Sequence, residues 1–97
     1  MDMGRTSVAI IGGGLAGLLA ARRLQMLDID AIVIEARERL GGRILSADQT
    51  GAPCDDGFDL GPSWFWPHVQ PEMAALARDL GLAAFPQHDD GDMVFER

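Results

Sequence analysis

The sequence predicts an α/β fold: a βαβ unit at the N-terminus, then a short β-hairpin, a helix and a terminal hairpin. Three observations support the βαβ unit. The apolar runs 8–11 and 31–34 are each uninterrupted, and the segment between them has helical periodicity. The glycine run 12–14 follows the first apolar run directly. Strand, turn, helix and strand together occupy about 30 residues, which is the length that a βαβ unit needs.

The segment between the two apolar runs has one apolar face. Arg22, Arg23 and Gln25 fall outside that face and are left for solvent. Asp28 and Asp30 are expected to end the helix. The apolar positions, which recur near the helical period, are Leu15, Leu18, Ala21, Leu24 and Leu27. Because both flanking runs are apolar throughout, we expect strands that are covered on both faces.

The glycine turn has the spacing of a dinucleotide-binding fingerprint. Gly12 permits a tight turn, Gly14 lets the backbone approach a pyrophosphate, and Gly17 lets the helix pack closely on the strand. The free N–H groups at the helix N-terminus, including those of Leu15 and Ala16, then face the phosphates. This turn predicts a site for the ADP half of a dinucleotide.

Glu35 closes the second apolar run, roughly 20 residues past the glycine turn, where this fingerprint carries an acidic residue. Its carboxylate can accept hydrogen bonds from both hydroxyls of the adenosine ribose. The same charge repels a 2′-phosphate, so NADP is disfavoured. The alternative interpretation is a plain βαβ unit with a glycine turn and no ligand.

The residues after Glu35 add a second glycine pair and basic side chains. Gly41 and Gly42 can bring backbone N–H groups near the pyrophosphate, and Arg43 supplies a fixed positive charge. Arg37 is expected near the adenine edge, and Ala36 is included with it among the predicted cofactor-binding residues.

Residues 35–43 resemble the flavin-dependent amine oxidase family, in which an acidic residue followed by a Gly-Gly-Arg turn binds FAD. The likeness continues through residues 58–64, which are similar to the family's Asp-x-Gly segment approaching the flavin, and through the helix end at 76–82. It therefore covers residues 7–82. The resemblance implies FAD as the cofactor. It also implies that four residues lie near the flavin, namely Gly61, Pro62, Ser63 and Trp64.

The resemblance also implies a reaction. In this family a hydride passes from the α-carbon of a neutral amine to flavin N5, and the resulting imine hydrolyses to a carbonyl product. Many members hold a water near N5 with a lysine, and all eight basic residues of this chain are arginines. We therefore predict no catalytic residue in this chain. Ala16 is a further departure, because many members carry a phosphate-contacting hydroxyl there.

The chain is short for this family. Its 97 residues support one small domain, whereas the enzymes it resembles are several times longer and carry a separate substrate domain. A dinucleotide-binding sheet needs at least a third parallel strand, and no further helix-then-strand pattern follows. We expect residues 1–97 to be the N-terminal part of an FAD-binding domain that is incomplete on its own. The substrate domain is absent, and the rest of the flavoenzyme lies downstream or on a second polypeptide.

Three further elements are predicted after the βαβ unit. Residues 43–47 and 56–60 are expected to pair as short strands around a turn-rich segment. Pro71 at the first helical position and a terminating Gly81 define a short amphipathic helix. Residues 93–97 are expected to form the return strand of a hairpin that turns at Asp90-Gly91.

Two aromatic residues and a histidine leave alternatives open. Trp64 and Trp66 line the flavin or are ordinary core aromatics. His68 is a candidate flavin-side base, although nothing in the sequence places it at the ring.

Composition limits the partners. The net charge of −7 disfavours nucleic acid, and 47% hydrophobic with 24% charged residues indicates a globular chain. No stretch reaches the ~18 apolar residues of a membrane span. A small-molecule amine is the substrate expected of the complete enzyme. The single Cys54 has no disulfide partner, which fits a cytoplasmic location.

The acidic clusters are interpreted as solvated turns and not as a metal site, because the adjacent residues 88–90 cannot all point inward. Two other functions remain open. One is the FAD module of a related flavoprotein, such as a carotenoid desaturase or a protoporphyrinogen oxidase. The other is a non-catalytic fragment, or a fold carrier of the kind seen in GDP-dissociation inhibitors.

Overall fold

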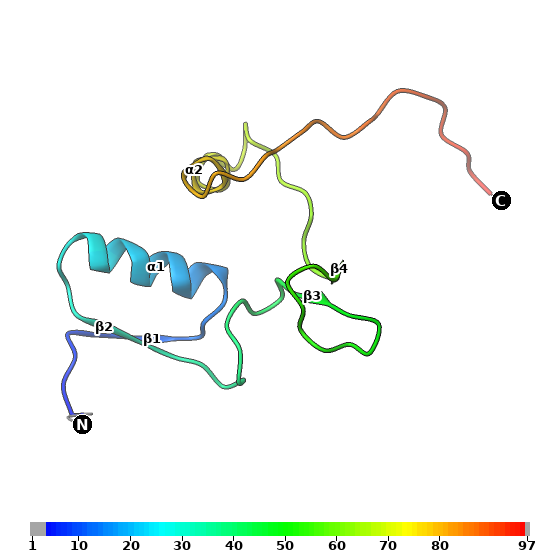
Figure 1. The fold of residues 1–97 in the computed structure, drawn as a ribbon. Coiled ribbons are helices and arrows are strands. Elements are labelled where there is room, and N and C mark those ends of the chain that lie inside the picture. Colours follow the sequence, from blue (N-terminus) through cyan, green and yellow to red (C-terminus); the bar gives the residue numbers. More distant parts are fainter. Residues whose placement is uncertain (1–3, 97) are drawn as a thin grey trace. The chain divides into compact units, whose positions relative to one another are not determined.

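A computed structural model describes residues 4–96 and contains six elements (Figure 1). The chain divides into two compact units, the first ending at Ser63 and the second starting at Trp64, and each is described by itself. In chain order the elements are β1 (Val8–Ile11), α1 (Leu15–Met26), β2 (Ala31–Ile34), β3 (Ser46–Ala47), β4 (Phe58–Asp59) and α2 (Pro71–Asp79).

The predicted βαβ unit is confirmed. β1 and β2 pair in parallel, with Val8 opposite Ala31 and Ile11 opposite Ile34, and α1 connects them (Figure 1). The ladder continues past the strand ends, because Gly12 N donates to Ile34 O at 2.8 Å. This continuation carries the register of the sheet into the glycine turn.

Only one face of this two-stranded sheet is covered. Ile10 and Val33 are half-buried, and Ile10 lies near Gly17 of α1. On the opposite face Ile11, Ile32 and Ile34 are 78%, 48% and 50% exposed. Within the described residues of the first unit, the strands are therefore covered on one face only, and the covering expected on the other face is not among these residues. One helix can cover one face of a sheet, and the apolar character of these strands exceeds what α1 buries.

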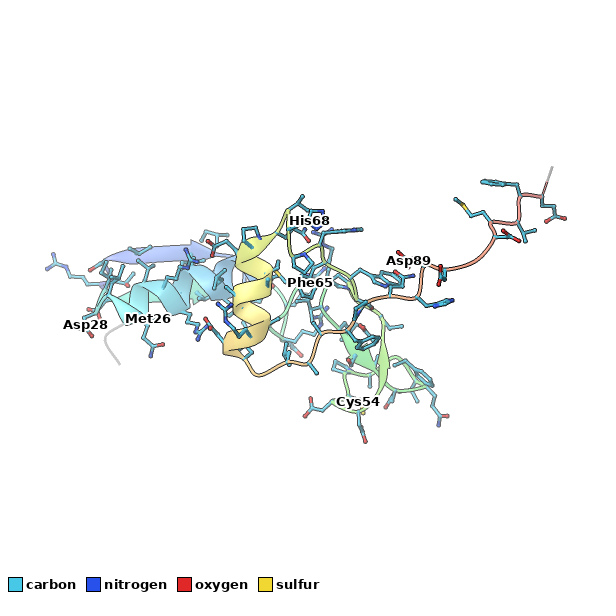
Figure 2. The ribbon with its side chains drawn as sticks, turned by 90° about the horizontal axis from the view of Figure 1, so that it is seen from above. Met26, Asp28, Cys54, Phe65, His68 and Asp89 are labelled. Atoms are coloured by element: carbon cyan, nitrogen blue, oxygen red, sulfur yellow. The ribbon has the colours of Figure 1, made fainter. Side chains whose placement is uncertain are left out.

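α1 ends in a reciprocal pair of backbone hydrogen bonds. Asp28 N donates to Gln25 O at 3.1 Å and Ile29 N donates to Leu24 O at 3.0 Å, which is the pattern of a Schellman motif. Asp28 takes the left-handed conformation that this motif needs, with φ 55°. Figure 2 labels Met26 and Asp28 at this end of the helix. Leu27, predicted on the apolar face, is the C-cap and is 69% exposed.

The predicted hairpin forms with shorter strands than expected. β3 and β4 are antiparallel, with Ser46 opposite Asp59 and Ala47 opposite Phe58. Ala47 is 1% exposed and is the one fully buried apolar side chain among the residues described. A side chain at Gly57 would overlap the Ala47 backbone, so this glycine lets the two strands meet closely.

The second unit contains α2. The helix begins at Pro71 and ends in a second Schellman motif, in which Gly81 has φ 69° and its N–H donates to Arg78 O at 3.0 Å. Both predicted ends are thereby confirmed. No helix in the described part of the chain is long and apolar enough to cross a membrane.

The predicted terminal hairpin is wrong. Residues 82–96 contain no strand, and Phe85, Met93 and Val94 are 87%, 82% and 94% exposed. Arg97, the last residue of the expected return strand, lies outside the described range. A two-stranded hairpin is at best marginal in water without a further layer against which to pack, and nothing in this segment is buried.

Candidate dinucleotide site

The turn between β1 and α1 presents bare backbone. Gly12 has φ 103°, a conformation that side chains disfavour, and Gly14 is the N-cap of α1. No side chain caps this helix, and its first turn carries no acidic residue. The first intrahelical bond runs from Leu18 N to Gly14 O at 3.0 Å. The N–H groups of Leu15, Ala16 and Gly17 therefore have no intrahelical acceptor, and the helix dipole makes this end positive.

Gly17 fixes how closely the helix approaches the strand. A Cβ at this position would overlap the carbonyl oxygen of Gly12 and would lie 3.3 Å from the Cγ2 atom of Ile10. Because the nearest atoms are backbone, a side chain at this position would force the helix and the strand apart, so only glycine allows this close approach. This geometry agrees with the packing role predicted for Gly17.

The second glycine pair lies directly beside the first turn. Gly41 N donates to Gly13 O at 2.8 Å, and Gly14 and Gly41 form a parallel β-bridge. A Cβ on Gly42 would lie 3.2 Å from the Cα of Gly14. We refer to Gly12–Gly14 together with Gly41 and Gly42 as the glycine cluster. Two stretches far apart in the sequence thus form one patch of backbone without side chains.

Glu35 joins the glycine cluster through backbone N–H groups. Its Oε2 accepts from Gly13 N at 2.6 Å and its Oε1 accepts from Arg37 N at 3.1 Å. The Arg37 and Gly13 hydrogen bonds lower the pKa of the Glu35 carboxyl, so it is ionised at neutral pH. The Ala36 N–H also hydrogen-bonds this carboxylate and lowers its pKa, and since a carboxylate offers about four acceptor sites, the group keeps capacity for a further donor.

Three arginines follow Glu35 and differ in their contacts. The Arg39 guanidinium donates to Gly42 O at 2.8 Å and to Leu40 O at 3.3 Å. Arg43 is exposed, and among the described residues its side chain has no hydrogen bond or ion pair. The charge of Arg37 attracts the Glu35 carboxylate. Sequence reasoning selected Arg37 and Arg43 but missed Arg39, whose position two residues before a glycine pair was the available signal.

A segment of the predicted flavin-contacting loop reaches the same region. Asp59 Oδ1 accepts from Gly61 N at 2.9 Å and Oδ2 accepts from Ser63 Oγ at 2.8 Å. These two bonds lower the pKa of the Asp59 carboxyl. A Cβ on Gly61 would lie 2.9 Å from Arg43 O, so this glycine packs against the Arg43 backbone. Asp59 belongs to the Asp-x-Gly segment noted in the sequence but was not among the predicted site residues; this spacing is typical of a side chain that bonds the backbone two residues on.

The remaining residues predicted near the flavin are exposed. Pro62 is exposed, and Trp64, which opens the second unit, is 68% exposed. Trp66 is 58% exposed. His68 lies in the turn that follows Trp66 and is exposed; Figure 2 labels this residue. The roles of these residues at a flavin stay predictions.

The remaining candidate groups are local. Cys54 is half-buried, and its Sγ donates to Asp56 Oδ1 at 2.9 Å, which lowers the pKa of the Asp56 carboxyl. Figure 2 labels Cys54. Within residues 4–96 no three His, Cys, Asp or Glu side chains are grouped so that they could hold a metal ion.

Comparison with known proteins identifies the family. The profile of the NAD(P)-binding Rossmann-like domain matches residues 10–80. The chain belongs to this family. The match includes both halves of the glycine cluster and Glu35, so the Rossmann-like unit is the same segment that the sequence and the fold single out.

This Rossmann-like chain is 36% identical over 89 residues to the probable flavin-containing monoamine oxidase A of Dictyostelium discoideum, covering 92% of this chain and 18% of that protein. It is 38% identical over 88 residues to the putrescine oxidase of Kocuria rosea, covering 91% of this chain and 17% of that protein. It is 39% identical over 82 residues to the L-amino acid dehydrogenase of Synechocystis, covering 84% of this chain and 17% of that protein. The resemblance stated from the sequence is confirmed. This chain spans less than a fifth of the length of these relatives.

A solved structure shows the same fold. Wild-type putrescine oxidase bound to putrescine superposes with a TM-score of 0.69 and 38% sequence identity. The match covers 82% of this chain and 17% of that one. The described architecture therefore corresponds to a part of the fold of a substrate-bound amine oxidase.

Proposed function

We propose that this chain forms the ADP-binding part of an FAD site in a flavin-dependent enzyme that oxidises amines. The observation that carries the proposal is the meeting of three elements: an uncapped helix N-terminus, two glycine motifs in contact, and an ionised carboxylate. These are the elements that bind a pyrophosphate and a ribose in dinucleotide-binding βαβ units.

The residues present fit the ADP half of FAD. A Cβ on Gly14 would have no neighbour closer than the Gly42 Cα, at 3.9 Å, so an anion can approach its backbone. The uncapped N–H groups of Leu15, Ala16 and Gly17 offer donors, and Ala16 acts through its backbone alone. Arg43 adds a cation that no described residue neutralises.

Glu35 is proposed to hold the adenosine ribose. Its oxygens already accept from Gly13 and Arg37, which orients the carboxylate before any ligand arrives. The charge that accepts two ribose hydroxyls also repels a 2′-phosphate, so FAD is favoured over NADP. Ala36 and Arg37 follow Glu35 and are proposed to border the adenine.

The segment from Gly61 to Trp64 is proposed to approach the flavin ring. Support comes from the packing of Gly61 on the Arg43 backbone, which joins this segment to the phosphate end of the site. Asp59 fixes the conformation of the loop through Gly61 and Ser63. Pro62 and Trp64 belong to the same stretch.

When bound, FAD supplies the hydride acceptor for oxidation of an amine at its α-carbon. No residue of this chain is proposed as catalytic. The names of the relatives support an amine or amino acid as substrate, since one is a putrescine oxidase and another an L-amino acid dehydrogenase. An oxidase passes its electrons to oxygen and a dehydrogenase passes them to another acceptor, so both kinds of acceptor are alternatives for this enzyme.

We propose that further protein completes this enzyme. The open face of the β1–β2 sheet exposes Ile11, Ile32 and Ile34, which are side chains suited to a second layer. The substrate-binding walls belong to that further protein. A cytoplasmic location is proposed because Cys54 is a free thiol with no disulfide partner.

Cofactor binding tests the proposal in the full natural polypeptide that carries these residues. The purified protein should be yellow and should release flavin on denaturation. Glu35→Gln and Arg43→Ala should each weaken FAD binding by about 1.5–3 kcal/mol, the range for a hydrogen bond to a charged group. Fluorescence titration of the apoprotein with FAD measures both effects.

Two substitutions serve as matched controls. Glu38→Gln makes the same change at an exposed residue three positions from Glu35, and Arg22→Ala removes an exposed arginine of α1. Both should leave the FAD dissociation constant unchanged. A wild-type protein that retains NADP and no flavin would contradict the proposal.

A further inference from the structure

Two arginines flank the Gly41-Gly42 pair, and they are used differently. Arg43 is exposed and has no described partner, whereas Arg39 is half-buried and holds two backbone carbonyls. Both side chains carry the same charge. Their difference in contacts indicates a difference in role.

Arg39 holds the peptide units on both sides of the Gly41-Gly42 pair. The carbonyl of Leu40 accepts from Arg39, and the N–H of the same peptide unit, at Gly41, donates to Gly13 O at 2.8 Å. That peptide unit is therefore fixed at both ends. Its orientation sets how the second glycine pair lies against the first turn.

The next contact fixes a donor. Gly42 O accepts from Arg39 Nη2 at 2.8 Å. No described peptide bond is cis, so the N–H of this unit, at Arg43, points opposite to its carbonyl and away from the guanidinium. Holding the carbonyl thus fixes the direction of the Arg43 N–H and the start of the Arg43 side chain.

Such a restraint matters at this place in the chain. Gly41 and Gly42 have φ values of 105° and 61°, and glycine has the greatest backbone freedom of any residue. Ile44 N donates to Gly41 O at 3.0 Å and closes this turn, whereas among the described residues no backbone N–H holds Gly42 O. A peptide that is left to move must be ordered when a ligand binds, and that ordering reduces affinity. A planar guanidinium with several donors in a fixed fork can hold two carbonyls together.

We propose that Arg39 is a positioning residue of the pyrophosphate site. It orders the Gly42–Arg43 peptide so that the Arg43 N–H and guanidinium face the anion, without binding the anion itself. This inference rests on the proposed function. Sequence reasoning offered no role for Arg39.

Dissociation constants of FAD and of ADP test this proposal in apoprotein made from the full natural polypeptide. Arg39→Gln should raise both constants by about tenfold, which corresponds to losing one hydrogen bond from a charged donor. Arg39→Lys should raise them less, since an ammonium can reach one carbonyl but not both. The KM for the amine should not change. Arg22→Gln makes the same charge change at an exposed site on α1 and should have no effect.

Salt dependence separates positioning from direct contact. A side chain that binds the pyrophosphate makes ADP binding weaken as salt rises, because added ions screen the pair. Arg43→Gln should therefore give a shallower salt dependence than wild type. Arg39→Gln should keep the wild-type slope at a reduced affinity.

Several results overturn the inference. If Arg39→Gln and Arg43→Gln reduce the salt dependence of ADP binding equally, Arg39 binds the anion directly. If Arg39→Lys keeps the wild-type affinity and Arg39→Gln does not, the charge of Arg39 is sufficient and the fork of donors is not needed. An unchanged dissociation constant with a lowered melting temperature makes Arg39 merely structural. If Arg39→Gln does not fold, the same criteria apply to Arg39→Lys. A wild-type apoprotein that binds neither FAD nor ADP overturns the proposed function as well.

Discussion

Residues 8–44 and residues 82–96 both expose apolar side chains, yet only the first segment is organised by contacts between distant residues. In the first, β1 pairs with β2, Gly41 bonds Gly13, and Glu35 bonds Gly13. In the second there is no helix or strand, and Phe85 and Val94 are 87% and 94% exposed. In the first segment, close contacts between backbone atoms are enough to hold the chain in place. The second segment would need a buried apolar core to become ordered.

Backbone approach dominates where side chains are absent. A Cβ on Gly42 would lie only 3.2 Å from the Cα of Gly14, and Gly17 packs against the Gly12 carbonyl. Each backbone hydrogen bond there contributes only about 0.5–1.5 kcal/mol. Residues 82–96 offer apolar side chains without a partner surface, and such a segment has nothing to offset its conformational entropy.

The largest effect is expected from testing the chain by itself. Residues 1–97 in isolation should neither fold into a stable monomer nor oxidise amines. The sheet has two strands with unpaired outer edges, and Ile11 is 78% exposed on its open face. Size-exclusion chromatography should show association, and a thermal scan should show no cooperative transition.

The opposite outcome is equally defined. A sharp melt of a monomer with stoichiometric FAD and amine-dependent peroxide formation would show that these residues form a complete enzyme. The two segments compared above would then both be organised in solution, and the distinction between them would fail.

Gly17→Ala should have the next largest effect. The added Cβ would overlap the Gly12 carbonyl oxygen, and overpacking of this kind costs about 1–3 kcal/mol or more. Urea unfolding of the full polypeptide measures the loss. Gly51→Ala is the control: no atom lies within 4 Å of its Cβ position, so only its φ of 84° opposes the change. An equal loss at both positions would mean that close approach of helix and strand is unimportant.

The sequence predicted what glycine and strand patterns encode locally. Gly12, Gly14 and Gly17 stand in the order that a βαβ turn requires, and Glu35 follows at the end of β2. From the sequence, each glycine motif was expected to approach the pyrophosphate separately, and a direct contact between the two motifs was not predicted. The structure brings the motifs into direct contact through the Gly41–Gly13 hydrogen bond.

Contacts of long side chains with backbone were not predictable in the same way. The position of Arg39 two residues before the glycine pair was a signal, but an arginine there can reach solvent, a phosphate or a carbonyl. The position alone does not choose between these contacts, so Arg39 was missed. The Asp-x-Gly segment was noted from the sequence, but the hydrogen bond by which Asp59 holds Gly61 N, typical of a local turn, was not predicted. The terminal hairpin failed because turn residues at 90–91 predict a bend but supply no surface to hold a return strand.

The smallest effect is expected from the left-handed residues at the C-terminal ends of α1 and α2. α1 and α2 finish in the same motif, but the left-handed residue is Asp28 in α1, with φ 55°, and Gly81 in α2, with φ 69°. The left-handed conformation costs a non-glycine residue roughly 1 kcal/mol, although Asp tolerates it better than most. Asp28→Gly should therefore stabilise the full polypeptide by about 0.5–1 kcal/mol in urea unfolding.

Asp30→Gly is the matched control. The φ of Asp30 is not positive, so glycine there only raises the entropy of the unfolded chain and should slightly destabilise the protein. Equal changes at both positions would show that the gain does not come from the left-handed conformation.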